Sequence, residues 1–554
     1  MPADLFHTLL LGAAVCAQSA NSLTTVGDAI SINPEAQMFT DTSGRVINLH
    51  GVNVLYKVDP YLPSTGEFNP ETSLNDEDIA NLVKWGMNFV RLSVMWEAVE
   101  RTEGVYDDEY LDNVEKLINN LGKSGIYTLV DMHQDAFARL SCGEGFPDFY
   151  AKQAAEKPYC INRLVDALLK PLYDKLGFCQ DMDDFGYEKD SDGNPLIDDC
   201  RKRPFWMYYL TKESIDGFEA VYNNKFGLRD KFIAYWDKVS SRFANNPYVV
   251  GYDPFNEPFF GNPFGHPLDA IPGYFDKNGL APLYSDIQKV YEKNDPTSKM
   301  WFEPVQETDV LGVLGGLVFN VGFESPPGRE IGSDRHVLND HVYCCQLTSD
   351  MCSATGEPGP QYADQCEEFH QKKIGTRAKD AAALGVPLMI TEFGACLTEG
   401  PCSAEITQVT SITDQYLAGW AYSMFKNFED ITTTAGTGEE GFYNADGTVQ
   451  DWKVKALTRS YMMKTQGTPK LLHFDPETAE LSFDFRLDTD ISEPSVAYLN
   501  EEYYYPKGVD FKIKADNGTY LTPEIEQQGN YHSFMITDEA LNGTLIRVSV
   551  SAVI

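Results

Sequence analysis

Short apolar, β-branched runs recur along the first three quarters of the chain and alternate with segments of helical periodicity. In one such segment Leu111, Val114, Leu117, Ile118 and Leu121 recur at the spacing of one helix face. Parallel strands that alternate with helices predict a (β/α)8 TIM barrel over residues 35–465. A doubly wound sheet is the alternative, but it would require a glycine-rich phosphate loop after an early strand, and the sequence has none. The eight predicted strands are 46–54, 89–94, 126–132, 249–255, 300–305, 336–342, 387–393 and 418–425.

The periodicity changes after the Gly467-Thr468-Pro469 turn. Large apolar residues there alternate strictly with polar ones, as in Leu481, Phe483, Phe485 and Leu487. A period of two predicts an antiparallel β-sandwich over residues 466–554, which would either bind carbohydrate or brace the barrel.

The interval after the third predicted strand is unusually long. It predicts an insertion at 138–228 on the face that carries active sites in such barrels.

Residues 1–17 have the pattern of a secretory signal peptide, with an apolar core and small residues at Val15 and Ala17. One of the eleven cysteines lies in this leader, so ten remain, an even number. They form three clusters, and we expect disulfides within each cluster, above all between Cys396 and Cys402. The sequons at Asn517 and Asn542 predict a glycoprotein. We therefore expect a secreted or lysosome-like protein, and the absence of a later apolar run of about 20 residues predicts no stable membrane anchor.

The charge balance restricts the partners. The chain of 554 residues has 44 Lys and Arg against 83 Asp and Glu, a formal net charge of -39. Such a charge argues against nucleic acid or an anionic membrane as a partner, because phosphate surfaces would repel the protein. A solvated acidic surface is the simpler explanation of the charge, and a protein built for an acidic compartment would have a similar composition.

Two glutamates carry the strongest chemical signal. Glu257 ends the fourth predicted strand within Asp253-Pro254-Phe255-Asn256-Glu257-Pro258, and Glu392 ends the seventh. Parallel strands of a barrel deliver such residues to one rim. Two carboxyl groups on one rim are what glycoside hydrolysis uses, since one group donates a proton to the leaving oxygen and the other attacks the sugar carbon. A retaining mechanism predicts that they lie about 5–5.5 Å apart.

Other strand ends supply further polar groups. A cation within an apolar strand requires an anionic partner, and we expect Arg91 to keep a catalytic carboxylate ionised. The remaining candidates would hydrogen-bond or stack on a sugar, although a core role competes for Trp420 and a structural role for His133. These candidates are His133, Asp135, Asn256, His341 and Trp420, whereas we expect Tyr343 to donate a hydrogen bond to the nucleophilic carboxylate.

These candidate residues and the segments around them resemble glycoside hydrolase family five of clan A, across about residues 35–460. The resemblance rests on Arg91, His133, Asn256-Glu257-Pro258, His341-Val342-Tyr343, Glu392-Phe393-Gly394 and Trp420. Within that family the chain is most similar to endoglycoceramidases, through Tyr56-Lys57, the run 131–135 and the carboxy-terminal sandwich. The resemblance implies that Glu257 is the acid/base and Glu392 the nucleophile. It further implies that the sugar nearest the lipid is held by Lys57, Asp135, Asn256, Tyr343 and Trp420. We expect neither a metal nor another cofactor.

The loops beside Glu257 are apolar, which favours an amphiphilic substrate. Phe259, Phe260 and Phe264 follow strand four, and Leu311, Leu314 and Leu317 follow strand five. We expect them to form a groove for ceramide, with packing of one loop on another as the alternative. The sequence thus predicts a retaining endo-β-glycosidase that cuts between oligosaccharide and ceramide. The alternatives are another family-five β-glycosidase (a glucosylceramidase, a galactosylceramide-directed enzyme or a β-glucanase) and a glycolipid-binding pseudoenzyme, which the presence of both glutamates disfavours.

Overall fold

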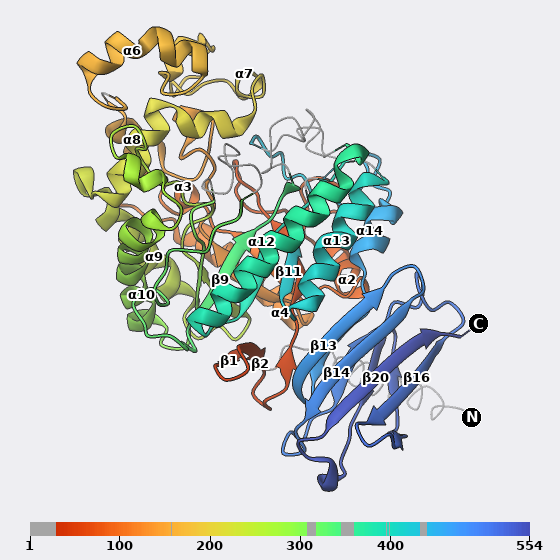
Figure 1. Ribbon diagram of the computed structural model, residues 1–554. Coiled ribbons are helices and arrows are strands. Elements are labelled where there is room, and N and C mark those ends of the chain that lie inside the picture. Colours follow the sequence, from red (N-terminus) through yellow and green to blue (C-terminus); the bar gives the residue numbers. More distant parts are fainter. Residues whose placement is uncertain are drawn as a thin grey trace, which may run out of the picture.

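A computed structural model describes residues 29–156, 158–306, 317–344, 359–394, 396–397, 399–432 and 440–553. Its centre is a closed barrel of eight parallel strands (Figure 1), in which the last strand pairs with the first. Each strand falls within one of the eight predicted runs, so the predicted TIM barrel is confirmed. The strands are β4 (His50–Val54), β5 (Phe89–Ser93), β6 (Tyr127–Asp131), β7 (Val249–Asp253), β8 (Met300–Phe302), β9 (His336–His341), β10 (Leu388–Glu392) and β11 (Gly419–Tyr422).

The barrel strands are buried on both faces because helices cover the outside and side chains fill the inside. Phe89, Leu129, Trp301 and Met389 fill the amino-terminal half of the interior. The next inward positions toward the carboxy-terminal ends are polar, and these positions carry the site described below. The helices that lie around the barrel are α2 (Asp76–Lys84), α3 (Trp96–Val99), α4 (Asp108–Lys123), α9 (Leu228–Phe243), α10 (Ala281–Asn294), α12 (Ala363–Leu384), α13 (Pro401–Gln415) and α14 (Asp451–Leu457).

The segment between β6 and α9, predicted as an insertion, folds into short helices above the carboxy-terminal ends of the strands (Figure 1). Its four helices are α5 (Asp148–Ala154), α6 (Arg163–Leu176), α7 (Ile197–Cys200) and α8 (Lys212–Tyr222). Two disulfides hold it, Cys142–Cys200 and Cys160–Cys179. Elsewhere Cys344 pairs with Cys366 and Cys396 with Cys402. Pairing within clusters is therefore confirmed for these eight cysteines, while Cys345 and Cys352 lie outside the described residues.

Two antiparallel sheets pack together in the carboxy-terminal region, as the alternating pattern predicts. One consists of β13 (Gly467–Asp475), β14 (Glu480–Leu487), β20 (Leu545–Ala552), β16 (Val509–Ala515) and β17 (Tyr520–Leu521). The other consists of β1 (Ser31–Asn33), β2 (Met38–Thr40), β3 (Val46–Ile47), β12 (Tyr461–Thr465), β15 (Ser495–Tyr498), β19 (Tyr531–Phe534) and β18 (Glu526–Gln528). Strands β1, β2, β3 and β12 come from outside the range 466–554 predicted for the sandwich. They join it because β12 pairs with both β3 and β15.

The sandwich is attached to the barrel through the end of α2. Three tyrosine hydroxyls of the sandwich donate hydrogen bonds to backbone carbonyls there: Tyr531 to Val83 at 2.7 Å, Tyr498 to Lys84 at 2.8 Å and Tyr461 to Gly86 at 2.8 Å. The last carbonyls of a helix have no partner within the helix, so these contacts satisfy groups that water would otherwise bind. This arrangement supports bracing of the barrel as the role of the sandwich.

Candidate active site

The site is organised around Arg91, whose side chain points from β5 into the barrel and is fully buried. Its Nη1 donates to Oε1 of Glu392 at 2.5 Å. Its Nε donates to Asp253 at 3.0 Å, and Nη2 donates to Asp131, also at 3.0 Å. A buried cation is tolerated only when its charge is paired and its N–H groups are satisfied, and both conditions are met here. Burial opposes the positive charge of Arg91, but the surrounding carboxylates outweigh this effect and raise the pKa of Arg91 above its ordinary value.

Glu392 ends β10 and lies beside two donors of different kinds. Arg91 donates to one carboxylate oxygen, and the hydroxyl of Tyr343 donates to the other at 2.8 Å. Burial alone would raise the pKa of this carboxyl group, but the charges of His341, Arg91 and His133 lower it to about 2. A carboxyl group with this pKa is ionised from mildly acidic pH upward, which is the state that a nucleophile requires.

Glu257 follows β7 in the left-handed region of backbone space, with φ at +38°. This conformation is uncommon for a residue with a side chain, and strain of this kind concentrates at functional sites. Two contacts hold it: the Glu257 amide donates to Glu303 at 3.0 Å, and Nδ1 of His341 lies 2.8 Å from the Glu257 carboxylate. Burial raises the pKa of Glu257 above its usual value. The two glutamates thus have pKa values shifted in opposite directions, as an acid and a nucleophile require.

One oxygen of Glu257, one of Glu392 and one ring nitrogen of His341 all lie within 4.8 Å of one another. Retaining glycosidases have carboxyl groups about 5–5.5 Å apart, whereas inverting enzymes leave about 6.5–9.5 Å for a water molecule. The observed spacing fits the retaining class. His341 is flanked by carboxylates, since its Nε2 lies 3.2 Å from Glu303. Burial opposes its charge, yet Glu303 and Glu392 raise the pKa of His341, which favours the cationic ring.

One wall of the site is formed by Lys57, Asp135 and His133. Lys57 is 2.7 Å from Asp135 and 3.0 Å from Asp430, and all three side chains are buried. His133 lies between Asp131, at 2.8 Å, and Asp135, at 3.5 Å. Burial disfavours its charge, but Asp131 raises the pKa of His133 to about 9. Charged donors and acceptors at one edge of the barrel are suited to binding sugar hydroxyls.

Asn256 contacts several of these groups at once. Its side-chain oxygen accepts from Arg91 at 2.8 Å, and its nitrogen donates to the carbonyl of Gln134 at 2.9 Å. The same nitrogen lies 3.5 Å from Nε2 of His133. Every predicted site residue except Trp420 therefore belongs to one connected network at the carboxy-terminal ends of the strands.

Trp420 does not lie in the site, and its predicted role as a platform for the sugar is wrong. Its neighbour Ala421 belongs to the cluster that fills the barrel interior. Successive side chains of a strand point to opposite faces, so Trp420 faces outward. It is fully buried there, stacked on His50 with ring centroids 4.5 Å apart, and His50 in turn stacks on Tyr461 of the sandwich. Trp420 is part of the wall between the barrel and the sandwich.

The predicted ceramide groove also needs correction. Phe259 and Phe260 are each 1% exposed and stack on each other, and Phe259 also packs against Phe218 of α8. They therefore help to pack the insertion onto the loop that follows β7. Phe264 is half-buried, stacked on Phe178, whereas Leu317 is 50% exposed. Leu311 and Leu314 lie outside the described residues.

Several buried acids of the site were missed by the sequence-based prediction: Asp131, Asp253, Glu303, Glu144 and Asp430. The first three end or follow β6, β7 and β8, the position at which Glu257 and Glu392 were recognised. An acidic residue at the end of an apolar run was therefore a usable signal. Glu144 and Asp430, near Lys57 in the loops, carry no such signal.

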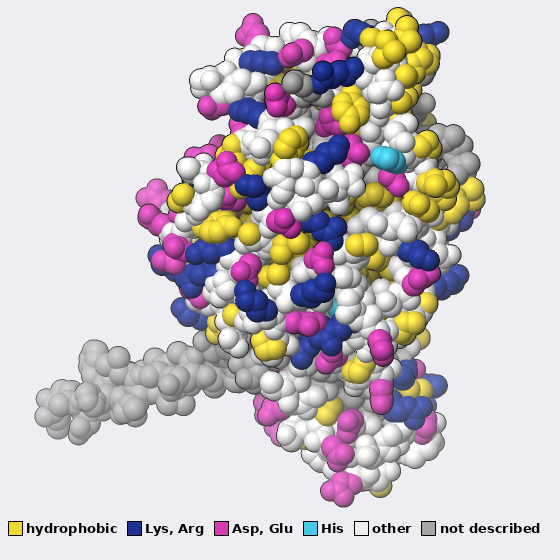
Figure 2. Space-filling model, turned by 90° about the vertical axis from the view of Figure 1, so that its left-hand side faces the viewer, with side chains coloured by type: hydrophobic (Ala, Val, Ile, Leu, Met, Phe, Trp, Pro, Cys, Tyr) yellow, Lys and Arg dark blue, Asp and Glu magenta, His cyan; other side chains and the backbone are white. Residues whose placement is uncertain are grey.

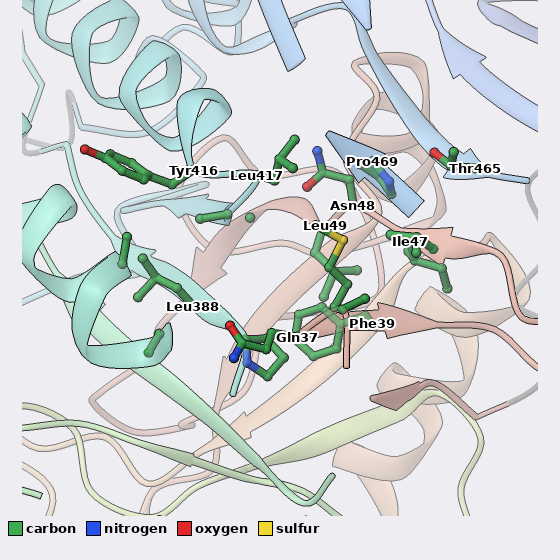
Figure 3. A pocket seen from close by; sticks show the side chains of 18 of the residues that line it. Gln37, Phe39, Ile47, Asn48, Leu49, Leu388, Tyr416, Leu417, Thr465 and Pro469 are labelled. Atoms are coloured by element: carbon green, nitrogen blue, oxygen red, sulfur yellow. The ribbon is translucent and has the colours of Figure 1, made fainter. Parts of the chain in front are cut away.

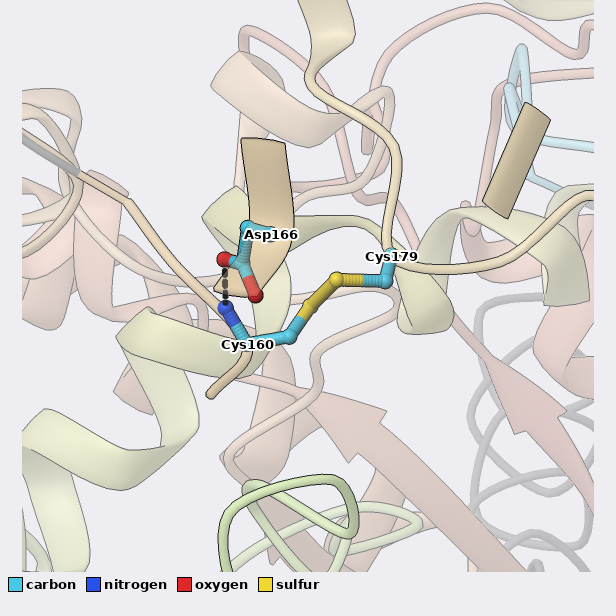
Figure 4. A group of neighbouring side chains, drawn as sticks. All are labelled: Cys160, Asp166 and Cys179. Atoms are coloured by element: carbon cyan, nitrogen blue, oxygen red, sulfur yellow. Dashed lines mark hydrogen bonds between the residues drawn. A yellow bond between two sulfur atoms is a disulfide. The ribbon is translucent and has the colours of Figure 1, made fainter. Parts of the chain in front are cut away.

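Two other features, a cavity and a cysteine–aspartate cluster, resemble binding sites. A cavity of about 120 Å³ lies at the opposite end of the barrel, where Gln37 and Phe39, Leu388 and Pro469 surround it (Figure 3). Its described lining has no acidic or basic side chain, so it offers no acid or base. The other feature, Cys160, Asp166 and Cys179, has the composition of a metal site, but the two sulfur atoms are bonded to each other (Figure 4). Asp166 there accepts from the Cys160 amide at 2.8 Å.

Comparison with known proteins gives a consistent result. The family model for cellulase (glycosyl hydrolase family 5) matches residues 41–170 and 211–429, and the model for the glycoside hydrolase family 5 C-terminal domain matches 459–550. The endoglycoceramidase of Cyanea nozakii is 29% identical over 489 residues, covering 87% of both chains. A glucosylceramidase of Cryptococcus neoformans is 32% identical, but over only 138 residues, 23% of this chain and 19% of the other. The structure of endo-glycoceramidase II from Rhodococcus sp. in complex with ganglioside GM3 has a similar fold, with a TM-score of 0.67, 21% identity and coverage of 93% and 99%.

Proposed function

The chain belongs to glycosyl hydrolase family 5, and from that membership we propose that it is a retaining endo-β-glycosidase that hydrolyses the linkage between oligosaccharide and ceramide in glycosphingolipids. The observation that carries the proposal is the pair of carboxyl groups at the barrel rim. Glu392 is ionised between Arg91 and Tyr343, and one of its oxygens lies within 4.8 Å of an oxygen of Glu257, whose pKa is raised.

In the first step Glu392 attacks the anomeric carbon of the sugar next to ceramide, and the bond from that carbon to the ceramide oxygen breaks. The proton of Glu257 passes to the leaving oxygen, so ceramide departs as a neutral alcohol. A covalent glycosyl-enzyme remains on Glu392. Tyr343 and Arg91 hold the two oxygens of Glu392 before the reaction, which fixes the direction of attack at no cost during the step itself.

In the second step Glu257, now a carboxylate, removes a proton from water, and the water oxygen attacks the same carbon. The bond to Glu392 breaks, and the oligosaccharide leaves with its original anomeric configuration after two inversions. Glu303 supports both steps through its contacts with the Glu257 amide and with His341. Lys57, His133 and Asp135 form the wall that binds sugar hydroxyls.

The extent of the similarity favours ceramide-linked oligosaccharides over the other family-five substrates. The endoglycoceramidase relative covers both the barrel and the sandwich, whereas the glucosylceramidase match covers less than a quarter of the chain. We place the sugar at the mouth of the barrel and the hydrocarbon chains along the loops that follow β7 and β8, where Phe264 and Leu317 remain accessible.

A comparison of hydrolysis rates on five substrates tests this assignment. A natural ganglioside, glucosylceramide, galactosylceramide, carboxymethylcellulose and mannan are incubated with equal amounts of enzyme in detergent. We expect the ganglioside to be hydrolysed at least about tenfold faster than the others, because the site accepts an oligosaccharide and an apolar aglycone together. Faster hydrolysis of either polysaccharide would make the protein a β-glucanase or a mannanase, and binding of ganglioside without turnover would make it a pseudoenzyme.

We also propose that the protein is secreted or enters a lysosome-like compartment. The apolar run within residues 1–17 and the four disulfides among the described residues support this, because disulfides persist in oxidising compartments. In the part of the chain that the structure describes, no helix combines the length and apolar character of a membrane span. Both sequon asparagines, Asn517 and Asn542, are exposed on turns of the sandwich. Amino-terminal sequencing and glycosidase treatment of the protein exported by its own cells would test cleavage and glycosylation.

A further inference from the structure

Helix α6 presents leucines to solvent. Leu164, Leu168 and Leu172 recur every four residues along one face and are 72%, 72% and 46% exposed. Ile161, just before the helix, is 38% exposed. The opposite face, with Asp166 and Tyr173, packs inward. An ordinary surface helix buries its apolar stripe, so exposure of such a stripe indicates a surface that another apolar body covers.

The helix is held firmly in this orientation. The Cys160–Cys179 disulfide joins the segments before and after it, and Asp166 accepts hydrogen bonds from the amides of Cys160 at 2.8 Å and Ile161 at 3.1 Å (Figure 4). These contacts join the segments that flank α6 to each other and to its first turn. The exposed leucines therefore lie on a helix whose two ends are covalently linked.

The α6 surface is continuous with the catalytic loop. The segment after Glu257 bonds to the base of α6, because Asn262 donates to the carbonyl of Cys160 at 2.6 Å. Phe264 stacks on Phe178, next to the disulfide, with centroids 5.1 Å apart. Beyond that loop Leu268 and Ile271 are 56% and 49% exposed. In Figure 2 hydrophobic side chains gather at the top, over α6, and recur below along the right-hand edge of the molecule. Helix α6 lies on the side of the barrel that carries the carboxy-terminal ends of the strands (Figure 1), where Glu257 and Glu392 are.

The charges on and around α6 indicate which kind of partner could cover its leucines. On α6 the side chains of Arg163 and Lys175 are exposed and basic, and Lys170, 45% exposed, pairs with Asp184, while the whole chain has a net charge of -39. Two basic groups beside an apolar stripe suit the phosphate groups of a phospholipid, whereas the large negative charge of the protein opposes approach to an anionic bilayer. A zwitterionic bilayer satisfies both conditions.

We propose that α6, together with Leu268 and Ile271, docks the enzyme onto the surface of a zwitterionic phospholipid bilayer, with the leucines among the acyl chains and the barrel mouth toward the membrane. This inference rests on the proposed function in one respect, since ceramide is itself anchored in a bilayer and has to be reached there. The docking surface acts on the lipid surrounding the substrate and is separate from Glu257 and Glu392.

Flotation with phosphatidylcholine vesicles that contain no glycolipid tests the docking directly. We compare the wild-type protein with the triple variant Leu164→Ser, Leu168→Ser, Leu172→Ser. The matched control is Ile331→Ser, Leu471→Ser, Val553→Ser, which removes three apolar side chains of 62%, 43% and 44% exposure remote from the active face. The α6 variant should bind vesicles about tenfold or more weakly, because each leucine contributes methylenes that leave water. The control should bind like the wild type, and phosphatidylserine vesicles should bind the wild type less well than phosphatidylcholine vesicles.

Activity measurements separate this inference from the proposed function. The α6 variant should lose ganglioside cleavage in vesicles in proportion to its loss of binding. It should keep cleavage of an aryl lactoside and of ganglioside in detergent micelles within about twofold, since its fold and catalytic groups are intact. A wild-type enzyme that fails to cleave ganglioside in micelles contradicts the proposed function, whatever the vesicles show.

Three results would overturn the docking proposal alone. The first is a wild-type protein that does not float with phosphatidylcholine vesicles, and the second is equal binding by the α6 variant. The third is a wild-type dimer in solution that the α6 substitutions convert to a monomer without any change in vesicle binding, because α6 would then cover a second copy of the chain.

Discussion

Nη1 of Arg91 lies 2.5 Å from Oε1 of Glu392, although the two residues are 301 positions apart in the chain. Strands β5 and β10 bring them together inside the barrel. The contact pairs a buried cation and at the same time keeps the Glu392 carboxylate, the proposed nucleophile, ionised, so the fold and the proposed chemistry depend on the same pair.

Replacing Arg91 by Met should destabilise the protein strongly. Asp131, Asp253 and Glu303 would lose the cation that they share, and removing one member of a buried charged group costs about 3–5 kcal/mol. The free energy of unfolding is measured by urea denaturation. As a control, Arg547→Met removes a charge that is 59% exposed and lies 3.4 Å from Asp484, and it should cost about 1 kcal/mol or less. Equal losses in the two variants would mean that the Arg91 cluster does not contribute as argued.

Glu257 and Glu392 should respond differently to an external nucleophile. Glu257→Gln and Glu392→Gln should each lose most turnover, about a thousandfold or more. With dinitrophenyl lactoside, whose leaving group needs no proton, azide should restore activity to Glu257→Ala, because it attacks the glycosyl-enzyme without needing a base, and the glycosyl azide should have retained configuration. No retained product should form with Glu392→Ala, which cannot form that intermediate. An inverted product from the wild-type enzyme would contradict the retaining assignment.

The pH dependence of kcat/KM should reflect the opposed pKa shifts. Glu257 has to be protonated, and burial raises its pKa, so activity should persist above the usual range of a carboxylic acid and fall as pH rises through the raised value. Glu392 has to be ionised, and its pKa of about 2 places the acid limb below the working range. With dinitrophenyl lactoside, whose leaving group needs no proton, Glu257→Gln should show no alkaline fall. An alkaline limb that persists in this variant would assign the titration to another group.

Trp420→Phe should affect stability and leave substrate binding unchanged. Its indole packs between His50 and Phe393 on the outer side of the barrel wall. The smaller ring leaves a cavity that should cost about 1–3 kcal/mol of unfolding free energy. KM for an aryl lactoside should remain within about twofold. A large increase in KM at unchanged stability would place Trp420 back in the sugar site.

The barrel was predictable because its strands are buried on both faces, so each is an uninterrupted apolar run that ends where the polar site begins. The two glutamates were predictable for the same reason, as was Arg91, a charge within such a run. The boundary between the barrel and the sandwich was harder to predict from the sequence. Val46–Ile47 and His50–Val54 read as one run, but the chain leaves one sheet for the other between them, and nothing local marks the change.

The errors concern the direction in which side chains point. Trp420 has the position along β11 expected of a sugar-stacking residue. Whether its side chain points into or out of the barrel depends on the register in which β11 pairs with β4, because a shift of one residue turns every side chain to the other face. Phe259 and Phe260 follow Glu257, and the contact that buries Phe259 against Phe218 of α8 is a tertiary one that the local sequence does not specify. Glu144 and Asp430 contact Lys57 through loops whose course no periodicity encodes.

The central claim, endo-cleavage at the sugar–ceramide bond by attack on the anomeric carbon, is tested most directly by mass spectrometry of the products from one ganglioside in ¹⁸O-labelled water. The account predicts two products, the intact oligosaccharide and unlabelled ceramide, because water attacks the sugar carbon and the ceramide oxygen stays with ceramide. Glu392→Gln should form neither product. Sequential release of single sugars, or ceramide carrying the heavy oxygen, would contradict it.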